Sequence, residues 1–220
     1  MNLSSRTVEI SADGVSLPGE LVLPPDPSAL VVFAHGSGSS RRSPRNVAVA
    51  ERLHRDGLGT LLFDLLTEQE STDRRLVFDI GLLGVRLALA VGVVTEDAAA
   101  SGLPIGLFGA STGAAAALVA SVTAPQVGAI VSRGGRPDLA GDALAQVTAP
   151  TLLIVGGKDR EVLDLNREAQ ARLRSRTRLE IMPGATHLFE EPGALERVAE
   201  LASGWFVRHL RPGGAARPVA

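Results

Sequence analysis

A serine in a short, glycine-flanked segment is the residue of this sequence best suited to nucleophilic chemistry. Ser111 is the middle residue of the segment 109–113, Gly-Ala-Ser-Thr-Gly, which follows the apolar run 104–108 and precedes the alanine-rich stretch 114–118. This order predicts a strand, a sharp turn and a helix. Glycines on both sides let the strand and helix backbones approach closely. The turn is therefore expected to expose the Ser111 hydroxyl above the first amides of the helix.

A serine hydroxyl becomes an effective nucleophile when a base accepts its proton and a carboxylate orients that base. Of the four histidines, His187 is the best candidate, because its loop follows the last predicted strand, 177–181. His54 and His209 fall within predicted helices, where a histidine is more often packed or solvated. His35 ends a strand before a glycine-rich loop, where we expect it to hydrogen-bond the backbone. His187 is therefore the predicted base.

The carboxylate is expected from the loop after the preceding strand, which holds Asp159. Ligands of open α/β sheets bind at the carboxyl ends of the strands, where these loops meet. Ser111, Asp159 and His187 follow one another at separations of 48 and 28 residues. Asp64 and Asp138 compete for the aspartate's role, and we interpret both as turn caps or arginine partners. The three loops predict a Ser-His-Asp triad.

The rest of the chain predicts an α/β fold with a mainly parallel central sheet and helices on both faces. The first two strands form a hairpin, and continuous apolar runs are typical of strands covered on both faces. Strands are expected near 7–10, 17–23, 30–34, 59–63, 104–108, 127–131, 151–155 and 177–181. Helices are expected near 45–56, 73–94, 114–118, 163–174 and 194–210. We interpret 1–210 as one domain and 211–220 as a disordered tail.

Composition excludes several classes of function. The net charge of −2 and the 3% of aromatic residues argue against a nucleic-acid partner. The chain has no cysteine, which excludes disulfides, thiolate metal sites and a cysteine nucleophile. No metal-ligand motif is present, so no metal or other cofactor is expected. The N-terminus lacks a signal-peptide pattern, and the apolar stretch 80–94 is too short to span a bilayer. A cytoplasmic protein without a membrane partner is expected.

In its order of serine turn, aspartate loop and histidine loop, the chain resembles the α/β-hydrolase superfamily over nearly its whole length. Its short length and the segment 35–40, His-Gly-Ser-Gly-Ser-Ser, are similar to the dienelactone-hydrolase-like branch. Domains similar to this one also occur joined to phosphoribosyltransferases. Dienelactone hydrolases proper use a cysteine nucleophile, whereas this chain has Ser111. The resemblance therefore implies a serine esterase that acts on small-molecule esters.

The resemblance also implies an oxyanion hole. One donor is the backbone N–H that follows the nucleophile, here Thr112. The second comes from the loop after the third strand, here Ser37, with Gly38 as the alternative. Small residues in that loop allow an amide to turn toward the site, and the loss of one such donor typically costs ~100- to 1,000-fold in rate.

Substrate contacts are less clearly marked. The interval 132–150 is too short for a lid domain, which predicts an open site. Arg133 leaves a strand at the same sheet edge, where it either binds a substrate carboxylate or phosphate or pairs with Asp138 or solvent. Gly38 and Leu188 are also expected to contact substrate. The cluster of Arg41, Arg42 and Arg45 is either a solvated face or a contact for an anionic leaving group.

Two alternatives stay open. The same triad could transfer the acyl group to an alcohol or to peroxide instead of water. The chain could also be a non-catalytic α/β module that binds a phosphorylated ligand. Segment 36–41 begins like a dinucleotide fingerprint but lacks its third glycine, and segment 156–159 lacks the hydroxyl residue and spacing of a P-loop. The acyl group, the alcohol and the oligomeric state are not determined by the sequence.

Overall fold

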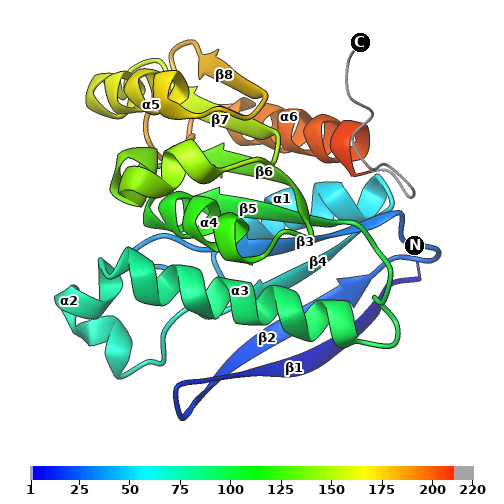
Figure 1. Cartoon of the computed structure of the whole chain (residues 1–220). Helices are drawn as coiled ribbons and strands as arrows, with labels where there is room; N and C mark the ends of the chain where they lie inside the picture. The colour runs from blue at the N-terminus through cyan, green and yellow to red at the C-terminus, as the bar shows by residue number, and fades with distance from the viewer. Residues whose placement is uncertain (1, 211–220) are drawn as a thin grey trace.

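The computed structural model describes residues 2–210, which form an eight-stranded sheet covered by helices on both faces (Figure 1). The strands are β1 Ser4–Ala12, β2 Val15–Leu23, β3 Ala29–Ala34, β4 Leu58–Phe63, β5 Ile105–Ala110, β6 Val127–Arg133, β7 Thr151–Gly156 and β8 Thr177–Met182. The helices are α1 Pro44–Arg55, α2 Arg74–Val77, α3 Ile80–Glu96, α4 Thr112–Thr123, α5 Arg160–Arg172 and α6 Ala194–His209, with 3-10 helices η1 Glu70–Thr72 and η2 Pro137–Gln146. The predicted disordered tail, 211–220, lies outside the described residues.

The sheet has the order β1-β2-β4-β3-β5-β6-β7-β8. β1 and β2 form the predicted antiparallel hairpin, and β2 pairs antiparallel with β4. From β4 to β8 all neighbouring strands are parallel. Every residue of β3, β4, β5 and β7 is buried, as their continuous apolar sequences predict. The carboxyl ends of β3, β5, β6, β7 and β8 therefore lie along one edge of the sheet.

Two large apolar cores, one on each face, hold this sheet, and a small third cluster joins Val155 to α5. In Figure 1, α3, α4 and α5 lie in front of the sheet and α1 and α6 lie behind it. The front core joins α3 and α4 to side chains such as Val32, Leu107 and Ile130. The rear core joins α1 and α6 to side chains such as Phe33 and Val131. Alternate strand residues thus face opposite cores, which fixes the register of every central strand.

The region predicted as one helix, 73–94, is two helices, so that prediction was wrong. α2 ends at Val77, and α3 begins after Asp79. Asp79 is the N-cap of α3, because its Oδ1 accepts a hydrogen bond from the backbone N–H of Leu82 at 2.9 Å. Apolar residues continue through the break, which is why the periodicity of the sequence hid it.

The segment between β6 and β7 contains the 3-10 helix η2, which is interrupted at Gly141. Its shortness leaves no lid domain over the sheet edge in the part of the chain that the structure describes. Within residues 2–210, no helix combines the length and the apolar character needed to cross a membrane.

The turn between β5 and α4 requires glycine on both sides of Ser111. A Cβ on Gly113 would lie 2.5 Å from the carbonyl oxygen of His35 and would also collide with that of Ala34. A Cβ on Gly109 would lie 2.6 Å from the carbonyl oxygen of Gly113. Real Cβ atoms do not approach backbone so closely, so α4 can start directly against the end of β3 only because these side chains are absent.

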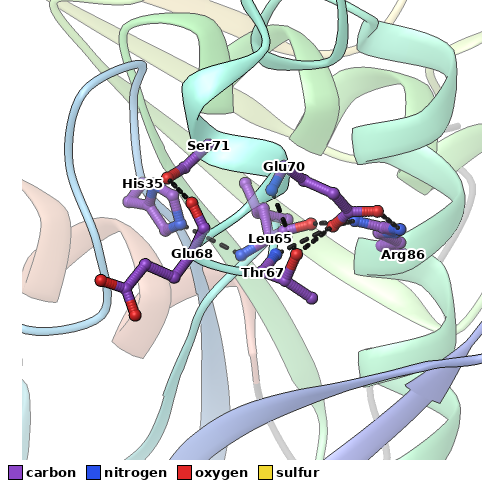
Figure 2. A network of polar contacts seen from close by, with 7 residues as sticks. All are labelled: His35, Leu65, Thr67, Glu68, Glu70, Ser71 and Arg86. Carbon is purple, nitrogen blue, oxygen red and sulfur yellow. Dashed lines mark hydrogen bonds and ion pairs between the residues drawn. The ribbon is translucent and has the colours of Figure 1, made fainter.

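A buried ion pair organises the loop that follows β4 (Figure 2). Arg86 of α3 is 2% exposed, and its Nη1 and Nη2 donate to the two carboxylate oxygens of Glu70, each at 2.8 Å. Nη1 also donates to the carbonyl oxygen of Leu65 at 3.0 Å. Glu70 Oε2 accepts a further bond from the backbone N–H of Thr67 at 2.9 Å. The Arg86 guanidinium, more than the Thr67 amide, lowers the pKa of Glu70 to about 2.

His35 anchors the same loop from the other side. The backbone N–H of Leu65 donates to His35 Nε2 at 3.0 Å, so the proton of the ring is on Nδ1, which donates to the carbonyl oxygen of Gly36 at 3.0 Å. Burial lowers the pKa of His35 and favours this neutral form. His35 therefore binds backbone on both of its ring nitrogens, as its position before the glycine loop predicts.

Replacing Gly113 with alanine tests how strictly the turn depends on close backbone approach. We expect Gly113→Ala to lower the free energy of unfolding by at least about 2 kcal/mol, because backbone atoms must move to admit the methyl group. Gly204 is the matched control, since it is also helical and a Cβ there meets nothing within 4 Å. Gly204→Ala should raise the free energy of unfolding by about 0.5–1 kcal/mol. Urea unfolding measures both, and equal effects would show that the turn tolerates a side chain.

The Glu70–Arg86 pair predicts a specific acid sensitivity. Because folding lowers the Glu70 pKa from 4.5 to about 2, its stabilisation is complete above 4.5 and is lost as pH falls toward 2. Glu70→Gln leaves the buried Arg86 charge without a carboxylate partner. It should lower the free energy of unfolding by about 3–5 kcal/mol at neutral pH. The stability difference between wild type and variant should shrink in acid. Denaturant unfolding at neutral and acid pH measures this difference. The control is the same exchange at an exposed neighbouring residue, Glu68→Gln. A stability difference that does not change with pH contradicts the prediction.

Candidate active site

Ser111 has the strained backbone of a residue at a strand-to-helix turn. Its φ is 52° and its ψ is −121°, in a region that residues with a side chain rarely adopt. Backbone bonds hold it there: its N–H donates to the carbonyl oxygen of Arg133 at 3.3 Å, and its carbonyl oxygen accepts from Ala114 and Arg136, both at 3.1 Å. Gly36 is so close that a Cβ there would lie 2.9 Å from Ser111 Cβ. The neighbouring loops thus impose the conformation that presents the hydroxyl.

Asp159 and His187 are in contact. His187 Nδ1 and Asp159 Oδ2 are 2.6 Å apart, which is a short hydrogen bond between an imidazole and a carboxylate. Asp159 precedes α5, but its side chain makes no capping bond and is free to bind the histidine. The backbone N–H of Lys158 donates to the carbonyl oxygen of Ala185 at 2.9 Å, which ties the aspartate loop to the histidine loop. The His187 side chain is 39% exposed and that of Asp159 is 16% exposed.

Backbone contacts also connect the histidine loop to the serine turn. Gly134 follows Arg133, whose carbonyl oxygen accepts from Ser111, and a Cβ on Gly134 would lie 3.6 Å from His187 Cε1. The His187 ring therefore lies against the end of β6, beside the turn that holds Ser111. No hydrogen bond joins Ser111 to His187 within residues 2–210. In active sites without substrate such bonds are often open and close when substrate binds.

The glycine-rich loop after β3 folds over the serine turn. The backbone N–H of Ser37 donates to Thr112 Oγ1 at 3.0 Å, and the N–H of Ser39 donates to the carbonyl oxygen of Gly36 at 3.2 Å. Gly38 has a φ of 67°, which only glycine adopts readily. Thr112 is the first residue of α4 and is 3% exposed. The structure thus brings both predicted oxyanion residues together, with the Ser37 amide bonded to the Thr112 side chain.

A cavity of about 1010 Å³ opens beside these two residues. It lies between the loop after β3 and the loop after β4, and Ser37 and Thr112 are part of its wall. The arginine cluster named above lines its outer part. Arg41 pairs with Asp64, which accounts for that aspartate without a catalytic role. Ser111 and His187 are not in the wall, so the cavity adjoins the predicted triad on the side of Ser37 and Thr112.

Arg133 is not a solvated arginine. Its side chain is buried on the rear face of the sheet, where Nη2 donates to Asn46 Oδ1 at 3.3 Å. Nε and Nη1 have no hydrogen-bond partner among the described residues. Burial and then the nearby Arg45 lower the pKa of Arg133 to about 10. Asp138 binds Arg136 instead, with two bonds of 2.8 and 2.9 Å, as one interpretation of that aspartate predicted.

The remaining predicted residues are placed as follows. Leu188 is 38% exposed next to the histidine. His54 Nε2 and Thr60 Oγ1 are 2.8 Å apart in the rear core, and His209 packs on Trp205, so both histidines lie away from the serine. Sequence reasoning missed the side chain of Thr112 as a partner of Ser37. The signal was present, because a residue with a hydroxyl group directly follows Ser111.

No model of a known protein family matches the chain. In two strains of Mycobacterium tuberculosis, a protein named "Putative phosphoribosyl transferase" is 56% identical over 210 residues, which is 94% of this chain and 47% of that protein. The chain therefore spans about half the length of these curated relatives.

Solved structures match the chain over nearly its whole length. A dienelactone hydrolase from Anabaena variabilis is 53% identical with a TM-score of 0.92, over 95% of this chain and 99% of that one. Est1E from Butyrivibrio proteoclasticus is 18% identical with a TM-score of 0.78, over 92% and 98% of the two chains, and shares the fold. High identity over the full length of a solved relative shows common descent. The chain belongs to the dienelactone-hydrolase-like branch of the α/β-hydrolases.

Proposed function

We propose that this α/β-hydrolase cleaves small carboxylic esters through an acyl-enzyme, with Ser111 as nucleophile, His187 as base and Asp159 as the orienting carboxylate. The observation that carries the proposal is the 2.6 Å contact between Asp159 and His187 beside the strained turn that presents Ser111. Backbone strain at a half-buried serine, together with an imidazole already bound to a carboxylate, is typical of nucleophilic catalysis.

The chemistry of this arrangement takes two steps. Ser111 Oγ attacks the ester carbonyl carbon while His187 Nε2 accepts the hydroxyl proton, and Asp159 stabilises the resulting imidazolium through Nδ1. Collapse of the tetrahedral intermediate breaks the bond to the alcohol, which leaves with the proton from His187. Water then attacks the acyl-enzyme with His187 again as base, and the carboxylic acid leaves Ser111. The negative oxygen of each intermediate is stabilised by the backbone N–H of Thr112 and by a second donor, located where the loop of Ser37 contacts Thr112.

The phosphoribosyl transferase name of the curated relatives does not point to transferase activity in this chain. Those proteins are about twice as long as the part that matches, so their transferase name describes more than this chain. Transfer to an alcohol or to peroxide needs the same acyl-enzyme and differs only in the acceptor. The exposed His187 and the absence of a lid over residues 2–210 favour access of water.

Arg133 adds a proposal about selectivity. Within residues 2–210, two nitrogens of the buried Arg133 guanidinium are unpaired and no carboxylate binds it, which is unfavourable unless an anion balances its charge. We propose that a carboxylate or phosphate on the substrate supplies this charge. The backbone bond between Arg133 and Ser111 supports the proposal, because it places the arginine one strand away from the reacting carbonyl.

The triad is tested with short-chain p-nitrophenyl esters. Ser111→Ala should abolish the hydrolysis that exceeds the uncatalysed rate, and Asp159→Asn should lower kcat about 10³- to 10⁴-fold, because the histidine loses its orienting charge. Asp138→Asn is the matched control and should keep the rate within about threefold, since among the described residues the Asp138 carboxylate binds only Arg136. A fluorophosphonate should label Ser111 in the wild type. An active Ser111→Ala variant would disprove the assignment.

Selectivity is tested by comparing a neutral ester with one of similar size that carries a carboxylate. Arg133→Met, which keeps much of the side-chain volume, should raise KM for the anionic ester about tenfold or more, because a charged hydrogen bond is lost. KM for the neutral ester should be unchanged. The control is Arg136→Met, whose charge is already paired with Asp138. Equal effects on the two esters would rule out a role for Arg133 in anion recognition.

A further inference from the structure

Thr112 carries two hydrogen-bond donors at one position, directly after the nucleophile. Its backbone N–H belongs to the first turn of α4, where amides are not used within the helix. Its side chain adds a hydroxyl, which accepts the N–H of Ser37 at 3.0 Å. The residue is 3% exposed and forms part of the wall of the cavity. Thr112 therefore lies next to Ser111 in the chain and borders the space that a substrate can enter.

The Thr112 hydroxyl makes fewer hydrogen bonds than it can among the described residues. A threonine hydroxyl has one proton to donate and two lone pairs to accept with. Ser37 occupies one lone pair, and within residues 2–210 no acceptor takes the proton. A buried donor without an acceptor costs free energy, commonly about 1–3 kcal/mol. A bound ligand with a carbonyl oxygen or oxyanion at this position would remove that cost.

The same bond limits what Ser37 can do. A backbone amide has a single hydrogen, and that of Ser37 is directed at Thr112 Oγ1. It therefore does not donate directly to a second oxygen in this arrangement. It does hold the threonine rotamer, and it polarises the hydroxyl, because a group that accepts a hydrogen bond becomes a stronger donor.

We propose that the Thr112 hydroxyl is the second donor of the oxyanion hole. Resting on the proposed ester hydrolysis, this assigns two hydrogen bonds to one residue: Thr112 N–H and Thr112 Oγ–H both bind the oxygen that becomes negative when Ser111 attacks. Ser37 is then a positioning residue that acts through Thr112. The hydroxyl keeps its proton throughout, so the proton transferred in the reaction is still the one that moves from Ser111 to His187.

Thr112→Val and Thr112→Ser form a matched pair for the test. Valine has nearly the shape of threonine and keeps the backbone N–H but lacks the hydroxyl, whereas serine keeps the hydroxyl. We expect Thr112→Val to lower kcat ~100- to 1,000-fold, with KM within about threefold, because the lost bond forms fully only at the transition state. Thr112→Ser should recover most of this loss.

A comparison of an ester with its thionoester separates catalysis from positioning. Sulfur is a weak hydrogen-bond acceptor, so the donor is worth much less when the carbonyl oxygen is replaced. Thr112→Val should therefore reduce kcat/KM strongly for the oxygen ester and only slightly for the thionoester. If Thr112 merely supported the loop, both substrates would lose activity by the same factor, and the proposal would be overturned.

Two other results would also decide against the proposal. A gain of activity in Thr112→Val would mean that the freed Ser37 amide is the true donor and that the threonine competes for it. Activity equal to wild type, with unchanged urea unfolding, would show that the hydroxyl is not used. Failure of the proposed function is recognised separately. In that case the wild type neither hydrolyses esters nor reacts with a fluorophosphonate at Ser111, and the oxyanion assignment falls with it.

Discussion

The close approach of the β5–α4 turn to the end of β3 is the constraint on which the rest of the site depends. Gly113 lies against the backbone carbonyls of Ala34 and His35, at a distance that admits no side chain. Contact at this point lets α4 begin immediately after Ser111 and holds that residue at a positive φ. It also brings the loop after β3 over the turn, where the Ser37 amide reaches Thr112. The proposed nucleophile, Ser111, and the proposed oxyanion residue, Thr112, therefore depend on the same packing contact.

Parallel pairing provides the other half of the arrangement. Because β5, β6, β7 and β8 all run in the same direction, the loops at their carboxyl ends meet at one edge. Short backbone bonds then join neighbouring loops, from Lys158 to Ala185 and from Ser111 to Arg133. The aspartate and histidine loops are thus positioned by main-chain contacts, which leaves the side chains of Asp159 and His187 free to bind each other.

The two buried arginines, Arg86 and Arg133, differ in how their charges are paired. The loop after β4 is held by a complete buried pair, in which Arg86 binds both oxygens of Glu70. Across the sheet, Arg133 is buried with no carboxylate partner in the described chain. Burial of a paired charge orders a loop, whereas burial of an unpaired charge favours binding of an anion. This contrast supports separate roles for the two arginines, one in the structure of the cavity wall and one in substrate selectivity.

Sequence by itself determined the succession of strands along the chain, the mainly parallel sheet and the three loops that hold Ser111, Asp159 and His187, because apolar runs and glycine turns are local signals. It did not reveal the break between α2 and α3 at Asp79. There the side chain of Asp79 caps α3, while apolar residues continue on both sides of it. Only the tertiary structure decided that Ser37 binds the Thr112 hydroxyl and that Arg133 lies buried beside Asn46. Those contacts join residues 75 and 87 positions apart, and partners so distant are set by packing, which no local pattern encodes.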